Sequence, residues 1–348
     1  MISKRLFTLY ALILTILVLV ASFTSCKNES DETFELRLAH FFPASHPAET
    51  VLVKEWSELL EKETDGRIKI VSYPGESLSK AADIYNGVVE GVADIGLSCF
   101  AYTPGRFPVL EAFELPGITY LNSRSASMVA WEGIKELDPE EVQDTKLLMV
   151  IATGPGDLFT KTAVESLDDI QGMEIRATGL SAVTIDHLGG IPVGMPQSDT
   201  YEALQKGLVK GNLSPIEVLK GWKHAEVTSY ITKTPFLYNT LFFVTMNLDK
   251  WNSMPKDLQK KITDVTEKFH EETASALWDM QNEAALGYAV DEQGMQIIDL
   301  SEEEKAAWIE KVMPIQDSYN AKLKDLGITL DPLKTIGKLA DKYNDKYK

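Results

Sequence analysis

The chain has 348 residues, which exceeds the usual size of a single hydrophobic core, so we expect two lobes or one large α/β unit. With 44% hydrophobic and 25% charged residues it can bury a sizeable core, which excludes a disordered protein and a polytopic membrane protein. The formal net charge of −18 repels phosphate backbones, so we expect no nucleic-acid partner.

The beginning of the chain has the pattern of an export signal. Two basic residues precede an apolar run over about 6–20, which is shorter than a membrane span requires. Small residues then precede Cys26, which resembles the lipobox of bacterial lipoproteins with Phe23 where leucine is usual. We expect 1–25 to be a lipoprotein signal peptide, Cys26 to carry the lipid, and 26–33 to be a polar tether. The alternative is an ordinary cysteine beside an uncleaved anchor helix.

The chain that follows opens with a β-then-α unit. Residues 35–40 alternate like a half-buried strand, and 48–64 repeat apolar residues at helical spacing. Strand patterns recur at 68–71 and 94–98, with a helix pattern over 81–90 between them. This alternation of strands and helices predicts an open parallel sheet.

A similar cycle restarts in the middle of the chain, which predicts a second lobe of the same kind. Strand patterns follow at 147–151, 173–176 and 241–246, and helix patterns at about 181–187, 201–208, 255–289 and 301–323. We therefore predict a two-lobed α/β clamshell with a long connecting helix. Lobe I would comprise 34–153 with about 245–283, and lobe II would comprise 154–244 with about 284–348. The hinge would lie near Gly154 and Thr245.

Local signatures of catalysis are missing from the sequence. Residues 154–156 lack the third glycine of a dinucleotide fingerprint, and the chain has no Gly-x-Ser-x-Gly, Cys-x-x-Cys or His-Glu-x-x-His motif. Lipidation of Cys26 would leave Cys99 as a single thiol. The five histidines are scattered, and His40 with His46 falls outside the common zinc spacings. We expect no enzyme, no cofactor and no metal site.

Several segments between about 34 and 328 share their order with one family. They are Leu38-Ala39-His40 with Pro43 and Pro47, then 66–78, 87–96, 107–116, 167–176 and 201–211, and finally Asn247 with 251–255. Taken together they resemble the extracytoplasmic solute-binding subunits of TRAP transporters, the DctP-type family. Lys210 stands where this family usually has an acidic residue.

The resemblance implies a periplasmic-binding-protein-like fold and a role in transport. Proteins of this kind bind a small organic acid and pass it to TRAP membrane permease subunits, which take it up by using an ion gradient. They work outside the cytoplasm, in the periplasm or at the outer face of the cell membrane. For this chain, a lipid on Cys26 would attach it to the membrane.

Arg176 is the predicted anchor for a carboxylate. It follows a strand-like apolar stretch, so its side chain would lie at a strand end, where open α/β sheets bind ligands. A guanidinium binds a carboxylate through two parallel hydrogen bonds, whereas lysine offers a point charge. The alternative is a surface arginine paired with Glu174 or Asp186, which we would favour without the resemblance.

Further candidate ligand contacts come from both halves of the chain. His40 would donate to a ligand oxygen from the end of the first strand, unless it is a loop histidine that bonds with the backbone. Lys80 would add a second cation, unless it is a solvated lysine. The other candidates are Phe41, Ser98, Cys99, Phe100, Gln197, Asn212, Ser214, Trp222 and Tyr238.

Two departures from the family's pattern bear on the ligand. Gly156 stands where some binders of acidic sugars have a second arginine, and 213–215 reads Leu-Ser-Pro where many members have Glu-Asn-Pro. Both changes remove polar side chains that could contact a ligand. Apolar walls with few polar groups suit a hydrophobic monocarboxylate, so we predict an aromatic or branched-chain acid. The flanking aromatic residues, any of which could instead pack the lobes together, are Phe41, Phe42, Phe100, Trp222, Phe236 and Tyr238.

Two other classes of protein stay open. A periplasmic hydrolase would need a nucleophile with a base in reach, for which Cys99 with His40 is the one imaginable pair. A lipid-anchored binding protein of another transporter type would take amino acids or sugars. Replacing Arg176 would separate the classes, because binding of a neutral sugar would survive the change.

Overall fold

The structure, a computed structural model, describes residues 32–348. The predicted signal peptide over 1–25, Cys26 and most of the predicted tether over 26–33 lie outside these residues. Within 32–348, no helix combines the length and the apolar character that a membrane span needs.

Five strands form the sheet of the first lobe. In order across the sheet they are β2 (Ile68–Tyr73), β1 (Phe34–His40), β3 (Ile95–Cys99), β10 (Leu241–Asn247) and β4 (Thr145–Ala152). The first three are parallel, as predicted. The prediction of a parallel sheet is wrong at β10, which runs antiparallel to both of its neighbours. The chain leaves this sheet through β4 and returns through β10 from the other lobe, so the two strands run in opposite directions.

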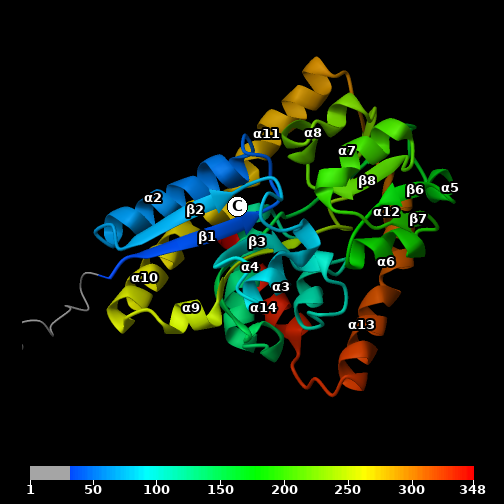
Figure 1. Ribbon diagram of the computed structural model, residues 1–348. Helices are drawn as coiled ribbons and strands as arrows, with labels where there is room; N and C mark the ends of the chain where they lie inside the picture. Colours follow the sequence, from blue (N-terminus) through cyan, green and yellow to red (C-terminus); the bar gives the residue numbers. More distant parts are fainter. Residues whose placement is uncertain (1–31) are drawn as a thin grey trace, which may run out of the picture.

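Six shorter strands form the sheet of the second lobe. In order they are β11 (Gln296–Ile298), β9 (Tyr230–Thr232), β5 (Asp157–Thr160), β8 (Gly211–Ser214), β6 (Glu174–Arg176) and β7 (Ile191–Val193). β6 is parallel to both of its neighbours, whereas β5 is antiparallel to both of its own. The predicted two-lobed α/β fold is confirmed, and Figure 1 shows the two lobes side by side.

Helices cover both sheets and connect the lobes. They are α2 (Lys54–Glu63), α3 (Ile84–Val89), α4 (Ser123–Leu137), α5 (Leu167–Ile170), α6 (Leu180–His187), α7 (Gln197–Lys206), α8 (Val218–Gly221), α9 (Leu248–Asn252), α10 (Lys256–Glu272), α11 (Asp279–Gly287), α12 (Glu302–Val312), α13 (Pro314–Asp325) and α14 (Pro332–Lys346). The helix predicted over 301–323 is divided at Pro314, where a proline suits a first turn better than a helix interior.

Helical spacing explains how α2 covers the first sheet. Trp56 and Leu60 lie four residues apart on one face of this helix, and both are buried. The Trp56 indole Nε1 donates a hydrogen bond to Thr266 of α10 at 3.0 Å, so the two helices are held together where they cover the sheet.

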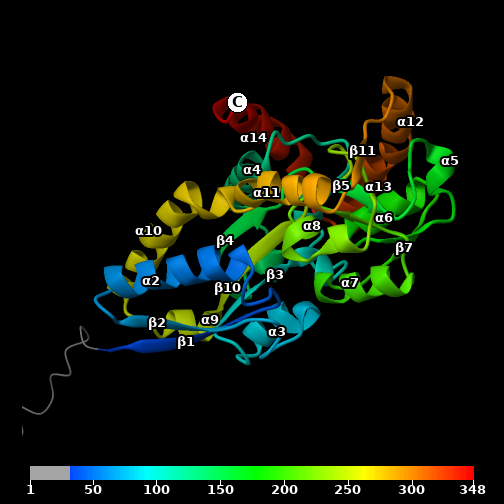
Figure 2. The ribbon, with the colours of Figure 1, turned by 90° about the horizontal axis from the view of Figure 1, so that it is seen from above.

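Within 32–348, the chain crosses between the lobes at four places, the last of them between α12 and α14. Residues 153–156 lead from β4 to β5, and residues 233–240 lead from β9 back to β10. These two segments lie side by side, because the Thr153 backbone N–H donates to the Thr240 carbonyl at 3.0 Å. The third crossing lies between α10, which packs on α2, and α11, which packs on α8 (Figures 1 and 2). A short 3₁₀ turn at Ala274–Ala276 interrupts the predicted long connecting helix there.

The end of the chain differs from the prediction that placed all of 284–348 in lobe II. α12 contacts α5 and α6 of the second lobe, but α14 packs along α4 of the first lobe. The amphipathic α14 buries Ile336, Leu339 and Tyr343, which recur at helical spacing, and its Lys342 pairs with Glu132 at 2.9 Å. The chain therefore returns to lobe I, which the sequence pattern of one helix could not reveal.

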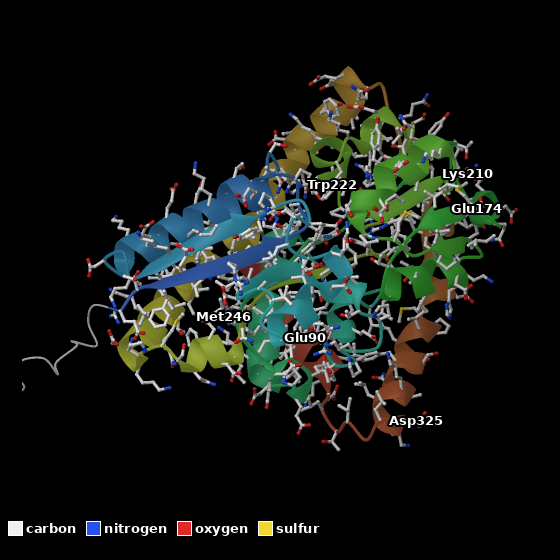
Figure 3. All side chains as sticks on the ribbon, in the orientation of Figure 1. Glu90, Glu174, Lys210, Trp222, Met246 and Asp325 are labelled. Carbon is white, nitrogen blue, oxygen red and sulfur yellow. The ribbon has the colours of Figure 1, made fainter. Side chains whose placement is uncertain are left out.

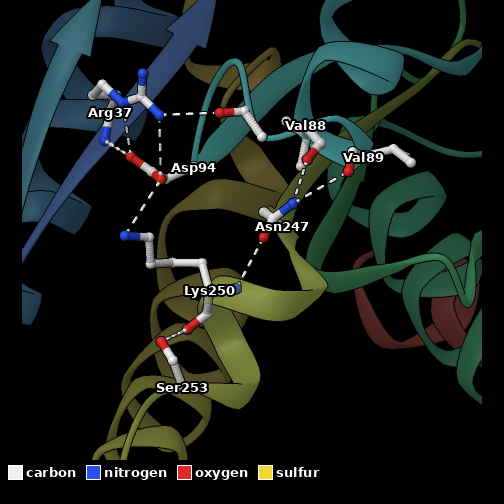
Figure 4. A network of polar contacts seen from close by, with 8 residues as sticks. Arg37, Val88, Val89, Asp94, Asn247, Lys250 and Ser253 are labelled. Atoms are coloured by element: carbon white, nitrogen blue, oxygen red, sulfur yellow. Dashed lines mark hydrogen bonds and ion pairs between the residues drawn. The ribbon is translucent and has the colours of Figure 1, made fainter.

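A polar network at the far end of the first sheet fixes β10 beside β3 (Figure 4). The carboxylate of Asp94 accepts hydrogen bonds from the backbone N–H and the side-chain Nε of Arg37, at 2.9 and 3.0 Å. Asn247 donates to the Val88 carbonyl at 2.8 Å and accepts from the Lys250 backbone N–H at 2.9 Å. These bonds link β1, α3 and α9, far from the meeting of the lobes.

Candidate functional site

A small cavity lies where the lobes meet, at the carboxyl ends of β1, β3, β4, β6 and β8. Its free volume is about 20 Å³, which holds about one water molecule. From the first lobe it is lined by Phe41, Phe42, Cys99, Tyr102, Thr153 and Phe242. From the second lobe and the crossing segments it is lined by Arg176, Thr178, Gln197, Pro215, Glu217, Val218, Trp222, Tyr238 and Thr240. The side chain of Trp222 reaches this boundary between the lobes (Figure 3).

Arg176 is the last residue of β6, and its side chain points into the interface between the lobes. The residue is 2% exposed. Nε donates to the Met195 carbonyl at 3.0 Å and Nη1 donates to Ser214 Oγ at 3.3 Å. Within 32–348, no carboxylate lies within ion-pair distance of this guanidinium, so the alternative of a surface arginine paired with a neighbour is wrong. A buried cation without an anionic partner is costly, and an incoming anion would remove this cost.

The hydrogen bonds behind Arg176 form a chain in which the donor and the acceptor of each bond can be assigned. A guanidinium can only donate, so the Ser214 hydroxyl accepts from it and gives its own hydrogen to Asn212 Oδ1 at 2.9 Å. The Asn212 amide nitrogen therefore faces His224 Nδ1 at 3.1 Å and donates to it.

His224 carries this direction onward to Gln197. Burial, and secondarily the charge of Arg176, lowers the pKa of His224 to about 3, so the imidazole is neutral and has one N–H. Because Nδ1 accepts, Nε2 carries the hydrogen. The Gln197 side-chain nitrogen lies 3.1 Å from it, and since two donors cannot bond, the amide must take the orientation turned by 180°. The oxygen of that amide must accept it, which leaves the amide nitrogen as the end of Gln197 available to the cavity.

Tyr102 joins the two lobes beside Arg176. Its phenolic oxygen accepts the Gln197 backbone N–H at 3.0 Å, and Arg176 Nη2 lies 3.5 Å from it. Burial raises the pKa of Tyr102, so the phenol keeps its proton. This end of the cavity therefore presents donors from Arg176, Gln197 and Tyr102.

Aromatic rings form the rest of the wall. Phe41 and Phe42 stack with ring centroids 4.3 Å apart, and each ring lies 6.0 Å from the ring of Trp222. Phe242 lies behind them, 6.2 Å from Phe41. Trp222 belongs to the second lobe and the three phenylalanines to the first, so stacked rings hold the lobes together.

Tyr238 occupies the place that a longer residue at position 156 would need. A Cβ on Gly156 would lie 2.5 Å from the Tyr238 ring and 2.7 Å from the Ser214 carbonyl oxygen. An arginine therefore does not fit at position 156 while this ring is in place. The family's pattern indicated that a second cation is missing at position 156, and the ring of Tyr238 fills the space beside that position.

Four of the predicted ligand contacts do not line the cavity. His40 Nε2 is bonded to Glu49 at 2.7 Å inside the first lobe. Ser98 donates to the Ala81 carbonyl, on the opposite face of β3 from Cys99. Lys80 is exposed and pairs with Glu76, and Phe100 packs against Tyr85, Phe107 and Phe243. Because His40 and Cys99 do not meet, the structure contradicts the one nucleophile and base pair that the hydrolase alternative required.

The other predicted contacts are brought together at the cavity. Phe41, Cys99, Arg176, Gln197, Trp222 and Tyr238 line it, while Asn212 and Ser214 support Arg176 from behind. The predictions missed Tyr102, Thr153, Thr178, Glu217 and others. Thr153 directly follows β4 and Thr178 lies two residues after β6, and this position after a strand end is a signal that could have found them. Tyr102 lies in a short 3₁₀ helix and Glu217 in the turn before α8, and neither place has such a signal.

Two α/β lobes that enclose a buried arginine, with no carboxylate partner within 32–348, are the architecture of a solute-binding protein. The family model for bacterial extracellular solute-binding proteins, family 7 (DctP), matches residues 38–322, so the chain belongs to this family. This finding confirms the resemblance to TRAP transporter subunits and an extracytoplasmic place of work.

Solved structures support the same assignment. A TRAP periplasmic solute-binding protein from Desulfovibrio salexigens is 34% identical with a TM-score of 0.77, over 90% of this chain and 97% of that one. A TRAP solute-binding protein from Rhodoferax ferrireducens, with copurified benzoate, is 26% identical with a TM-score of 0.84, over 91% and 100%. A marine metagenome TRAP protein specific for aromatic acids, with metahydroxyphenylacetate, is 30% identical with a TM-score of 0.82, over 90% and 99%.

Proposed function

We propose that this protein captures an aromatic monocarboxylate outside the cytoplasm and delivers it to the permease subunits of a TRAP transporter. The observation that carries this proposal is the guanidinium of Arg176, which is buried between the lobes without a described carboxylate partner. Loss of aromatic-acid binding on replacement of this arginine is the test.

The donors around Arg176 suit one carboxylate. A guanidinium has five N–H groups, and its bonds to Met195, Ser214 and Tyr102 use three of them, so one hydrogen on each terminal nitrogen remains. The phenolic hydrogen of Tyr102 and the amide nitrogen of Gln197 lie at the same end. Such donors bind an anion in a fixed orientation.

The walls favour an aromatic over a branched acid. Phe41, Phe42 and Trp222 offer ring faces to a flat ligand, and Tyr238 removes the room for a second cation at position 156. The two similar proteins that hold benzoate and metahydroxyphenylacetate support this choice. A sugar or an amino acid as the ligand is not favoured.

Binding requires the lobes to separate and close again. The cavity volume of about 20 Å³ is far below the roughly 150 Å³ of a cavity that accepts benzene. Contacts across the interface are close, since a Cβ on Gly179 of the second lobe would lie 2.9 Å from the Ala101 Cβ of the first. Rotation about the crossing segments 153–156 and 233–240 would open the cleft, and a carboxylate bonded by both lobes would favour closure.

The proposal includes a lipid on Cys26 that attaches the protein to the membrane. Its support is the signal-like pattern of 1–25 and the small residues before this cysteine. Labelling of cells with an alkyne fatty acid tests it. A Cys26→Ser variant that still takes up the label would refute it.

Calorimetric titration of the protein with benzoate and phenylacetate tests the ligand class. Arg176→Gln should weaken binding at least 100-fold, since it removes a charge-assisted bidentate contact and leaves the anion buried. Lys210→Gln is the matched control, because Lys210 is an exposed cation of the same lobe (Figure 3). Equal affinities of Arg176→Gln and the unmodified protein would refute the proposal.

A further inference from the structure

Glu217 is a second buried charge on the wall of the cavity. It is 3% exposed and directly precedes α8 in the second lobe. Its Oε2 accepts a hydrogen bond from His46 Nε2 of the first lobe at 3.0 Å. Nothing in the binding of a plain monocarboxylate uses this group, since its charge has the same sign as the ligand.

The environment of His46 shows that it supplies one hydrogen bond and no charge. Its Nδ1 accepts the Ala48 backbone N–H at 3.0 Å, so a neutral ring carries its hydrogen on Nε2, where it meets Glu217. Within 32–348, no group forms a hydrogen bond to the other carboxylate oxygen, Oε1. Glu217 therefore has a free acceptor on the wall of the cavity.

A series of ring contacts connects Arg176 with Glu217. Tyr102, which contacts Arg176, lies 5.5 Å from Phe41 between ring centroids. Phe41 stacks on Phe42 at 4.3 Å, and Phe42 stacks at 4.7 Å on the ring of His46, which bonds Glu217. The cavity thus has donors beside Tyr102, an acceptor beside His46, and aromatic faces between these two rings.

We propose that Glu217 is a specificity-determining residue, and that the ligand is an aromatic acid with a hydrogen-bond donor, a hydroxyl or amino group, on the ring end remote from its carboxylate. The proposal rests on the function proposed above. A ring with such a donor satisfies Oε1, whereas a plain ring leaves a buried carboxylate without water or a second partner. A ligand with a second carboxylate would be repelled.

Titration of the unmodified protein with matched phenylacetates tests this specificity. The 4-hydroxy and 3-hydroxy acids are each compared with the fluoro acid of the same substitution, because fluorine is small and cannot donate. Loss of a hydrogen bond to a charged group predicts that the better hydroxy acid binds about 10- to 100-fold more tightly than its fluoro analogue. The acids with an amino group on the ring, 4- and 3-aminophenylacetate, should likewise bind more tightly than the fluoro acids.

Glu217→Gln should reduce the ratio of the hydroxy-acid affinity to the fluoro-acid affinity at least fivefold, because a neutral amide is a weaker acceptor than a carboxylate. Glu202→Gln is the matched control, since Glu202 is an exposed carboxylate of the same lobe paired with Lys206. A hydroxyl preference that persists in Glu217→Gln overturns the proposal.

If Glu217→Gln does not fold, the affinities of the unmodified protein for the hydroxy and fluoro acids test the role of Glu217. Hydroxy and fluoro acids that bind within threefold of each other, with binding still dependent on Arg176, overturn the role of Glu217 and leave the proposed function standing. No binding of any aromatic acid overturns both.

Discussion

The hydroxyl of Tyr102 should be essential for tight binding, although it lies on the lobe that does not carry the arginine. Tyr102→Phe removes one oxygen atom and leaves the ring in contact with Phe41. In the closed form this change leaves the Gln197 backbone N–H, now 3.0 Å from the phenolic oxygen, without an acceptor. In the open form water can bond to that N–H, so the penalty falls on closure.

The expected magnitude follows from the two bonds that are lost. A buried N–H without a partner costs about 1–3 kcal/mol, and the bond from a phenol to a carboxylate contributes about 1.5–3 kcal/mol. Since the two effects overlap in one site, we expect a loss of about 2–4 kcal/mol, which is roughly a 30- to 700-fold weaker Kd. Most of the change should appear as faster dissociation, because closed contacts are lost.

Stopped-flow and equilibrium titrations that follow the intrinsic tryptophan fluorescence, to which Trp222 at the cavity contributes, would measure both quantities. Tyr120→Phe is the control, since the Tyr120 hydroxyl donates to the Phe113 carbonyl inside the first lobe at 3.1 Å. It should lower the melting temperature without changing the affinity. A Kd for Tyr102→Phe within threefold of the unmodified protein would show that this hydroxyl does not take part in closure.

Three other changes have defined outcomes. Arg176→Lys should weaken benzoate binding about 10- to 100-fold by titration, because lysine keeps the charge but loses the fork of donors; an unchanged Kd would contradict this. Gly156→Arg should lower the melting temperature through its clash with the Tyr238 ring 2.5 Å away, and Tyr238→Ala in the same chain should restore part of the loss. Burial raises the pKa of Glu114 to about 8, so the folded protein binds this proton more tightly and loses stability as pH rises from about 4.5 to 8. Glu114→Gln should therefore raise the free energy of unfolding more at pH 8 than at pH 5 in urea denaturation, and an equal gain at both would contradict the shift.

The sequence predicted those parts of the molecule that depend on local pattern. The strand predicted at 147–151 is found at 145–152, because the apolar run and the strand coincide. The pattern also placed Arg176 at the end of a parallel strand, at the edge where the lobes meet, but the choice of this arginine over a surface ion pair depended on the resemblance to the family.

The predictions failed where distant segments decide the outcome. Ser98 and Cys99 are adjacent in one strand, and only their pairing with other elements decides that Cys99 faces the cavity while Ser98 faces Ala81. The bond between His46 and Glu217 joins residues 171 positions apart in the sequence. No periodicity in a single sequence encodes such a contact, so Glu217 became visible only in three dimensions.

The direction of the hydrogen bonds behind Arg176 explains how one anion can drive closure. The closed form takes the guanidinium out of water, and its remaining partners within 32–348 are neutral oxygens of Met195, Ser214 and Tyr102. Closure without an anion therefore bears the cost of a desolvated charge, whereas closure around a carboxylate replaces water with an oppositely charged partner. A ligand shifts such an equilibrium only through its difference in affinity for the two forms. The unpaired arginine makes that difference large for an acid and small for a neutral solute, so the same group that orients the ligand also decides which ligands close the protein.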